Sequence, residues 1–263
     1  QALVSPFVLR RVKEDVVADL PEKIEDTVMA QLTGEQRKLY LANQDRIAQQ
    51  VQHREASEFK KDKLKVLAEL TKLRQICCDP RLHYEDYKAG SAKLDTCMEL
   101  VYGALDGGHR ILLFSQFTGM LDIIGKRLAK EDIAFLKLTG ASSKESRAKM
   151  VAQFQAGEVP VFLISLKAGG VGLNLTAADV VIHYDPWWNV AAQDQATDRA
   201  HRIGQQHTVT VYKLIAKDTI EERIMQMQES KRDLVNSVLG GDGISSALFT
   251  REDVLTLLGG DGR

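Results

Sequence analysis

The sequence predicts an α/β fold built around a mainly parallel β-sheet with helices on both faces. From about residue 108 onward, short apolar runs alternate with longer helical patterns, and this alternation is typical of a parallel sheet covered on both sides. The chain has 263 residues, of which 44% are hydrophobic, so it can fill a sizeable core. A helical region precedes the sheet, and an amphipathic helix follows it.

The region from about residue 30 to 85 has a helical pattern that opens with Thr33 as a candidate N-cap. Its second half carries four leucines at a threefold spacing, namely Leu64, Leu67, Leu70 and Leu73. We therefore expect a small helical hairpin. The charged run EFKKDKLK lies between the two helices. Such a run is typical of a solvated face, and a contact with phosphate is the alternative.

Five strands are expected next, in the runs RILLFS, AFLKLT, VPVFLISL, VVIHYD and TVTVYKLIA. Helices are expected between them at 117–130, at 144–155 and from Asn189. Parallel sheets place their ligand sites at the carboxyl ends of the strands. Those ends carry FS, LTG, SLKAGGVGLNL and DPWWN, which are polar, glycine-rich or aromatic. We therefore expect one edge of the sheet, together with the helix after DPWWN, to form the functional surface.

The last part of the chain predicts a helix from Thr219 to about Leu239 and a loosely ordered tail. An apolar stripe runs along this helix, formed by Ile220, Ile224, Met227, Leu234 and Val238. The simple interpretation is that the stripe packs on its own domain. The tail contains GGDG twice, and the spacing of Thr250 and Asp253 predicts a capped short helix within it.

Composition excludes several classes of protein. Three cysteines without metal spacing suit a reducing compartment with no disulfide framework. No signal peptide and no apolar run long enough for a membrane span is visible. A formal net charge of −1 argues against wholesale coating of nucleic acid, but it allows a local basic groove. The first residue is glutamine, so we expect a fragment of a longer chain.

Arg199 and Arg202 in QATDRAHRIGQ are expected on one face of a helix, beside Gln195 and Asp198. Guanidinium groups form fixed forks that suit phosphate oxygens, so the pair could complete a nucleotide site as arginine fingers. The alternative is a surface salt bridge worth about 0 to 1 kcal/mol. His183 and His201 have no partner at metal spacing, so both are interpreted as structural and no metal site is predicted.

The segment AGGVGLNL places Gly169, Gly170 and Gly172 close together. Glycine permits positive φ and close approach of the backbone, so N–H groups here could cradle a phosphate. A plain strand-to-helix turn explains the cluster equally well. Lys167, just before it, could reach a phosphate or simply be solvated.

Trp187 and Trp188 follow Asp185 and Pro186 at a strand end. Paired tryptophans at such a place most often wedge a loop against the core. The alternative is that one of them lies against a nucleic-acid backbone or base.

A phosphate loop of the form GxxxxGK[ST] is missing from the sequence. The nearest segment, TGASSKES, lacks the second glycine. The chain therefore carries candidate arginine fingers without the loop that would hold the nucleotide.

Several segments together resemble one family. ILLFSQFTGMLDII, LTGASSKESR, VFLISLKAGGVGLNLTAADVVIHYDPWWN and QATDRAHRIGQ are similar to successive motifs of the second RecA-like lobe of Swi/Snf-type helicase-like ATPases, in helicase superfamily two. FVLRRVKEDVVADLPEK and LRQICCDP resemble the same family's junction and helical insertion. The resemblance implies a RecA-like three-layer domain with a small helical insertion and a C-terminal brace helix. The implied boundaries are a junction at 1–29, the insertion at 30–90, the lobe at 91–217, the brace helix at 218–240 and a flexible tail with a short helix at 241–263.

The resemblance also implies roles for individual residues. The expected catalytic residues are Arg199 and Arg202, with Arg202 as the first choice for the finger. Four further residues are expected to bind the nucleotide: Gln195, Gly170, Gly172 and Asn174. Six are expected along the DNA: Ser115, Gln116, Thr139, Gly140, Lys167 and Trp187. ATP and Mg²⁺ would be held mainly by a first lobe outside this chain, so the chain alone should be inactive.

The implied function is the second motor lobe of an ATP-dependent translocase on double-stranded DNA, with a protein–DNA complex as the substrate being remodelled. Gln205 stands where RNA helicases of neighbouring families usually have arginine, which favours DNA over RNA without excluding RNA unwinding. The alternative is an autonomous non-catalytic module that binds DNA or a partner. No membrane partner is expected, and the implied location is the bacterial cytoplasm or nucleoid, or the nucleus in a eukaryote. By the same resemblance, the brace helix would reach back to the first lobe and leave an exposed apolar strip here.

Overall fold

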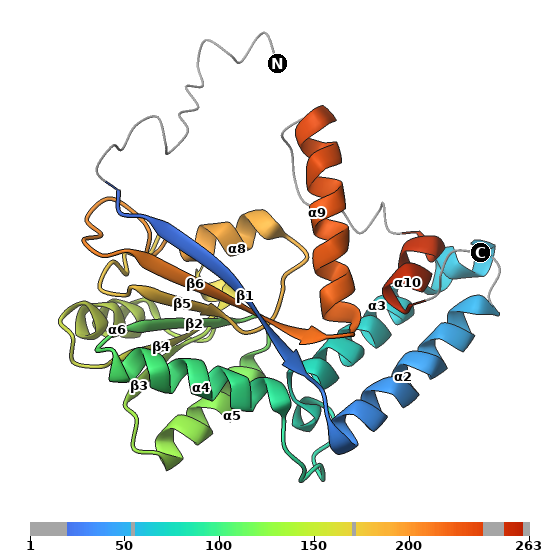
Figure 1. Ribbon diagram of the computed structural model, residues 1–263, viewed down its shortest axis with the longest axis horizontal. Coiled ribbons are helices and arrows are strands. Elements are labelled where there is room, and N and C mark those ends of the chain that lie inside the picture. The colour runs from blue at the N-terminus through green and yellow to red at the C-terminus, as the bar shows by residue number, and fades with distance from the viewer. Residues whose placement is uncertain (1–19, 54–55, 170–171, 239–249, 260–263) are drawn as a thin grey trace.

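The computed structural model describes residues 20–53, 56–169, 172–238 and 250–259. Its centre is a sheet of six strands, all parallel, in the order β1-β6-β5-β2-β4-β3 (Figure 1). The strands are β1 (Lys23–Gln31), β2 (Ile111–Ser115), β3 (Phe135–Leu138), β4 (Val161–Ser165), β5 (Val180–His183) and β6 (Val209–Lys217). The predicted α/β class with a parallel sheet is confirmed.

Helices surround the sheet and extend beyond its carboxyl ends. They are α2 (Gly34–Gln52), α3 (Ala56–Cys78), the 3-10 turn η2 (Pro80–Leu82), α4 (Ala92–Asp106), α5 (Thr118–Lys130), α6 (Lys144–Gln155), α7 (Leu166–Gly169), α8 (Val190–Thr197), α9 (Ile220–Val238) and α10 (Arg251–Leu257). In Figure 1 the arrowheads of β1 and β6 point toward α2, α3 and the root of α9. The helical insertion therefore stands beside the carboxyl edge, which is the side of the sheet where the strands end.

Two separate cores explain why β2 and β4 read as unbroken apolar runs. In β2, Ile111 and Leu113 pack into the core beneath α4 and α5, whereas Leu112 and Phe114 pack into the core beneath α6 and α8. Side chains of a strand alternate between the two faces, and both faces are covered here, so every residue of β2 is buried. The three-layer arrangement expected for a RecA-like domain is thereby confirmed.

β1 is a strand that the sequence did not predict. It pairs in parallel with β6 from Lys23↔Val209 to Gln31↔Lys217 and forms one edge of the sheet. Most of its side chains are exposed, so it has no apolar run to mark it as a strand. The residues assigned to a junction at 1–29 therefore supply, from Lys23 onward, a part of the sheet itself.

α4 was also not predicted, although its buried positions recur as a helix requires. Leu94, Cys97, Met98 and Val101 are buried on one side of it, at the spacing of an apolar helical stripe. Ser91 is the N-cap, and its Oγ accepts a hydrogen bond from the backbone N–H of Leu94 at 3.4 Å.

The expected helical hairpin is present as α2 and α3. Leu70 and Leu73 are buried, whereas Leu64 is 82% exposed. A threefold spacing drifts around a helix of 3.6 residues per turn, so the four leucines cannot all share the buried face. Thr33 occupies the N-cap of α2 but makes no side-chain capping bond.

α9 packs on its own domain at its root. Ile220 and Ile224 are buried in a core shared with α3 and α10, and Met227 packs partly against it. Figure 1 shows the rest of α9 rising away from the sheet. The side chains of Leu234 and Val238 lie outside the described residues, so the expected exposed strip stays a prediction.

α10 confirms the short helix predicted in the tail. Asp253 N–H donates to the Oγ1 of Thr250 at 3.1 Å, and Thr250 N–H donates to an Asp253 carboxylate oxygen at 2.9 Å. This reciprocal pair is a capping box. Both GGDG segments lie largely or wholly outside the described residues.

Cys77, Cys78 and Cys97 are free and buried. Burial raises the pKa of the Cys97 thiol to about 12, so that thiol is unreactive at neutral pH. No helix in the described part of the chain is long and apolar enough to cross a membrane.

Candidate functional site

Arg199 and Arg202 lie in a turn rather than on a helix. α8 ends at Thr197, and the segment 198–205, here called the arginine turn, follows it. The carbonyl oxygen of Arg199 accepts a hydrogen bond from the backbone N–H of Leu175 at 3.0 Å, so it is engaged outside the helix. Gly204 has a φ of +100°, which an L residue rarely adopts. The expected helical face shared by the two arginines is therefore wrong, because long-range contacts end the helix early.

Arg199 is almost desolvated, with 8% of the residue exposed. Burial lowers its pKa, the nearby charge of Arg202 lowers it further, and Asp198 acts in the opposite direction. The side chain of Arg202 is half-buried, and its Nη1 lies 3.4 Å from the carbonyl oxygen of Leu173. Two neighbouring cations in a partly desolvated site attract an anion strongly.

Gln205 holds the arginine turn in place. It is 6% exposed, and its Nε2 donates to the carbonyl oxygens of Ala178 at 2.8 Å and Ala200 at 3.1 Å. Its Oε1 accepts from the backbone N–H groups of Gln206 and His207. In the sequence, Gln205 served only to favour DNA translocases over RNA helicases. In the structure it is buried and holds the arginine turn in place.

His201 ties the arginine turn to the start of β1. Its Nε2 lies 2.7 Å from the carbonyl oxygen of Pro21. The described residues contain no group of three or more His, Cys, Asp or Glu side chains that could hold a metal ion.

The glycine-rich segment reaches the arginine turn through residues 172–175. Gly172 is exposed, with a φ of +33° and nothing within 4 Å of the position of a Cβ. Asn174 is exposed beside it, and Gln195 is exposed on α8. Gly170 and the side chain of Lys167 lie outside the described residues. The structure thus brings Gly172 and Asn174 next to Arg199 and Arg202.

A second polar cluster occupies the carboxyl edge, centred on Asp185. This residue is 1% exposed. Its carboxylate accepts from Ser115 Oγ and from Gln116 Nε2, the latter at 2.6 Å. Ser115 is fully buried and Gln116 is half-buried, so both expected DNA residues point their polar atoms inward at Asp185. The pairing of β2 with β5 sets Phe114 opposite His183 and brings their following residues together.

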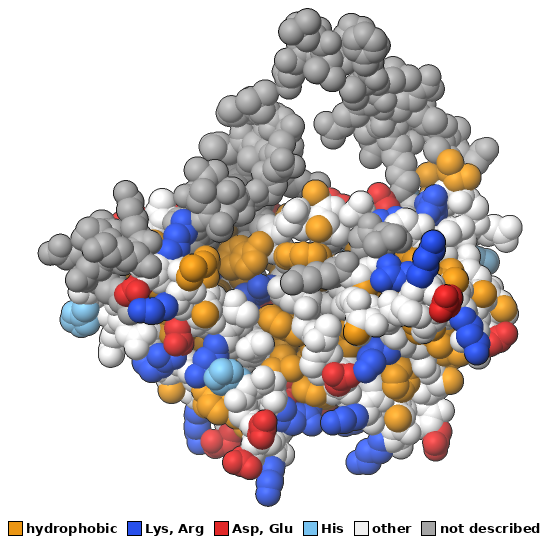
Figure 2. All heavy atoms as spheres, turned by 180° about the vertical axis from the view of Figure 1, so that it is seen from behind, with side chains coloured by type: hydrophobic (Ala, Val, Ile, Leu, Met, Phe, Trp, Pro, Cys, Tyr) orange, Lys and Arg blue, Asp and Glu red, His pale blue; other side chains and the backbone are white. Residues whose placement is uncertain are grey.

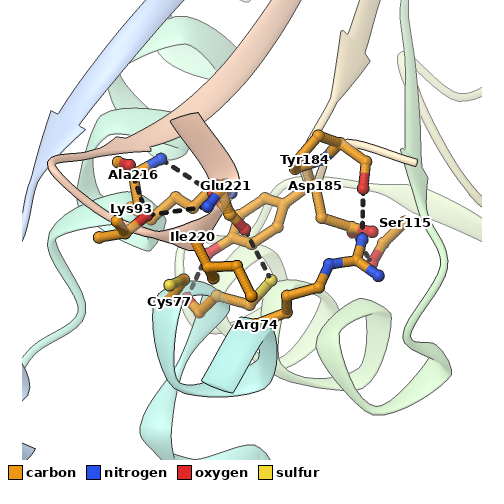
Figure 3. Close-up of polar contacts among 12 residues, drawn as sticks. Arg74, Cys77, Lys93, Ser115, Tyr184, Asp185, Ala216, Ile220 and Glu221 are labelled. Carbon is orange, nitrogen blue, oxygen red and sulfur yellow. Dashed lines mark hydrogen bonds and ion pairs between the residues drawn. The ribbon is translucent and has the colours of Figure 1, made fainter. Parts of the chain in front are cut away.

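Arg74 reaches the same cluster from α3, and the sequence gave no sign of it. It is 2% exposed, its Nη1 donates to Gln116 Oε1 at 3.1 Å, and its Nη2 donates to the carbonyl oxygen of Pro186. Figure 3 shows Arg74 extending toward Ser115 and Asp185. A lone arginine within an apolar helix face carries no sequence signal of such a contact.

The tryptophans are partly buried and support the packing interpretation. Trp188 packs against the core of the insertion, and Trp187 packs against the core beneath α6 and α8. The carbonyl oxygen of Trp187 accepts from Gln228 Nε2 of α9. Thr139, half-buried, and Gly140, exposed, follow β3 along the edge.

The predicted single surface is in fact two. Ser115, Gln116, Thr139, Gly140 and Trp187 mark the carboxyl edge. The arginine turn instead lies near the amino ends of the strands, because Gln205 and His201 bind carbonyl groups that precede β5 and β1. α8 runs from the first surface to the second, so it connects them rigidly over about 12 Å.

His183 links β5 to the end of α8, as the structural interpretation predicted. Its Nε2 lies 2.8 Å from Thr197 Oγ1, and burial lowers its pKa to about 3. The neutral ring therefore persists in the folded state, whereas an unfolded histidine binds a proton below a pH of about 6.5.

Acid should consequently destabilise the fold through His183. Between pH 6.5 and 3 the unfolded state binds the extra proton, so the free energy of unfolding falls as the pH falls. We expect a loss of about 2 kcal/mol between pH 7 and pH 5 from this residue. Urea unfolding at both pH values measures it. His183→Gln should remove this part of the pH dependence, and His207→Gln, at an exposed site, should keep it.

Comparison with known proteins identifies the family. Residues 92–204 match the helicase conserved C-terminal domain, and residues 1–82 match the SNF2-related domain. A protein of Mycoplasma pneumoniae, named as an uncharacterized ATP-dependent helicase, is 40% identical over 255 residues, covering 96% of this chain and 24% of that protein. The chain thus spans about a quarter of the length of this relative.

Solved structures from Sulfolobus solfataricus give the same assignment. The SWI2/SNF2 ATPase core in complex with double-stranded DNA superposes with a TM-score of 0.75 and 36% identity, covering 97% of this chain and 55% of that chain. The SWI2/SNF2 ATPase C-terminal domain superposes with a TM-score of 0.73 and 32% identity, covering 90% of this chain and 98% of that one. The chain belongs to the Swi/Snf-type ATP-dependent helicase family, and it is the C-terminal RecA-like lobe of the ATPase core.

Proposed function

We propose that this chain is the second motor lobe of an ATP-dependent translocase on double-stranded DNA. The observation that carries the proposal is the arginine turn, in which the desolvated Arg199 and the adjacent Arg202 lie beside Gly172 and Asn174. A salt bridge on an exposed surface would not need such burial. A polyphosphate offers several anionic oxygens that could engage both guanidinium groups.

Arg202 is the proposed finger, and Arg199 supports it with a second charge. During phosphoryl transfer, negative charge spreads over the transferring oxygens, and an arginine placed against them lowers the barrier. Gln195, Gly170, Gly172 and Asn174 are proposed to border the nucleotide. ATP and its Mg²⁺ are proposed to be held mainly by a first lobe outside this chain, and this lobe would reach the phosphates through its arginines and the residues beside them. Mg²⁺, when bound with ATP, would neutralise phosphate charge. The chain alone is therefore proposed to be inactive.

The carboxyl edge is the proposed track for DNA. Gln116, Thr139, Gly140, Lys167 and Trp187 are proposed to line it, with Ser115 acting from beneath through Asp185. Figure 2 shows Lys and Arg side chains spread among apolar and acidic ones on the face drawn, rather than gathered into one patch. This distribution, with a net charge of −1, supports a few local phosphate contacts that position the duplex without reading its sequence. The solved relative in complex with double-stranded DNA supports DNA as the partner.

ATP hydrolysis by the full-length protein, titrated with duplex DNA, tests the proposal. We expect duplex DNA to stimulate hydrolysis and duplex RNA to compete poorly. With about four phosphate contacts, each doubling of the salt concentration should weaken the apparent DNA affinity roughly tenfold. The absence of ATP hydrolysis, with or without nucleic acid, would instead favour an autonomous non-catalytic binding module. Stronger stimulation by RNA would make the protein an RNA-dependent motor.

A further inference from the structure

Arg74 is a buried cation whose hydrogen-bond acceptors are neutral. Its Nη1 and Nη2 donate to the side-chain oxygen of Gln116 and the carbonyl oxygen of Pro186. Its Nε is buried with no hydrogen-bond partner among the described residues. Burying a charge in this way is costly, and a methionine or leucine would fill the same space on α3 without that cost. The position of the charge therefore calls for a reason beyond packing.

Aromatic rings hold the guanidinium group in place. It lies 5.8 Å from the ring centre of Phe117 and 5.6 Å from that of Trp188. Phe117 follows β2 and Trp188 follows β5, so the two rings come from the two loops that the hydrogen bonds of Arg74 also join. Contacts of this kind between an arginine and aromatic rings are favourable when the charge is desolvated.

The two loops are the ones proposed to face DNA. Gln116 accepts from Arg74 and donates to Asp185 at 2.6 Å, so its amide joins the insertion to the buried carboxylate. The carbonyl oxygens of Pro186 and Trp187 accept from Arg74 and Gln228, respectively. The loop with the tryptophans is thus fixed from α3 on one side and from α9 on the other. The polar contacts of Arg74, Asp185 and Ser115 can be followed in Figure 3.

We propose that Arg74 is a positioning residue through which the helical insertion sets the shape of the DNA-facing loops after β2 and β5. Arg74 is too deeply buried to touch DNA itself. It orients the amide of Gln116 and the backbone at Pro186, and a misplacement of such groups by about 1 Å is enough to weaken binding. The inference rests on the proposed function, because it assumes that these loops meet DNA.

Arg74→Met in the full-length protein tests this role. The DNA concentration that gives half-maximal ATP hydrolysis should rise about tenfold, while the KM for ATP stays the same, because the arginine turn lies at the other end of α8. Arg74→Lys keeps the charge but loses the fork, so it can serve only one of the two acceptors and should give a smaller rise. Arg46→Met is the matched control, because Arg46 is a half-exposed arginine of the same insertion that pairs with Glu69. It should leave the half-saturating DNA concentration unchanged.

Combining Arg74→Met with Gln116→Leu separates positioning from a general loss of stability. If Arg74 acts through Gln116, the half-saturating DNA concentration of the double variant should be no higher than that of the more impaired single variant. Effects that multiply would overturn the inference, as would a half-saturating DNA concentration that neither Arg74 variant changes. If the wild-type protein shows no stimulation by DNA, the proposed function fails first and the inference fails with it.

Discussion

Replacement of Arg202 by alanine should lower ATP turnover by the full-length protein about a thousandfold or more, with ATP and DNA binding largely kept. Arg202 is held beside the Leu173 carbonyl and next to the desolvated Arg199, so its charge is already in position. An interaction made mainly in the transition state lowers kcat rather than raising KM. Steady-state hydrolysis at saturating DNA, with separate measurements of nucleotide and DNA binding, gives the two effects independently.

Two further variants make this result specific. Arg127→Ala removes an arginine of α5 that pairs with Glu131, the residue after that helix, on the opposite face of the sheet, and should change turnover little. Arg202→Lys keeps the charge without the planar fork, so it should recover only part of the lost rate. If Arg202→Ala hydrolyses ATP within a fewfold of the wild-type rate, the arginine turn is structural and the binding-module alternative gains support.

The sheet was largely predictable because local patterns reflect how its strands are buried. β2 and β4 have both faces covered, so their apolar runs stand out, and α6 shows the expected bounds of Lys144–Gln155. β1 escaped detection because it lies at an edge with most of its side chains exposed. An exposed strand that gains its order from β6 leaves no hydrophobic pattern in the sequence.

The site was predictable by residue type but not by position. Arg199 and Arg202 were recognised from their spacing, yet the end of α8 depends on a bond to Leu175, which is remote in sequence. Asp185 and Arg74 gain their partners only after β2, β5 and α3 meet. Such contacts depend on the order of the strands in the sheet, which the local pattern of residues does not reveal. Tertiary contacts therefore decided where each recognised residue lies.

Replacement of Lys93 by methionine should lower the free energy of unfolding of the lobe by about 3 to 5 kcal/mol. Lys93 of α4 and Glu221 of α9 form an ion pair in which both side chains are fully buried. Burial lowers the pKa of Lys93, but the charge of Glu221, its hydrogen bond and the nearby Cys78 and Asp185 together outweigh burial and raise the pKa. Figure 3 shows the pair at the junction of β6 and α9, beside Tyr184. Without Lys93, the carboxylate keeps a hydrogen bond from Ala216 N–H at 2.9 Å but loses its countercharge.

The double variant Lys93→Met with Glu221→Gln identifies the cause of that loss. It removes both charges, so it should be more stable than Lys93→Met alone, because no uncompensated carboxylate remains in the core. Lys130→Met, at the exposed end of α5, should stay within about 0.5 kcal/mol of the wild type. Urea unfolding of the wild type, Lys93→Met, Glu221→Gln and the double variant gives the coupling between Lys93 and Glu221. A loss below about 1 kcal/mol for Lys93→Met would show that water or a local rearrangement neutralises Glu221. The ion pair would then not be what fixes α9 to the lobe, and the packing of Ile220 and Ile224, with the hydrogen bond from Ile220 N–H to Tyr40, would carry that role.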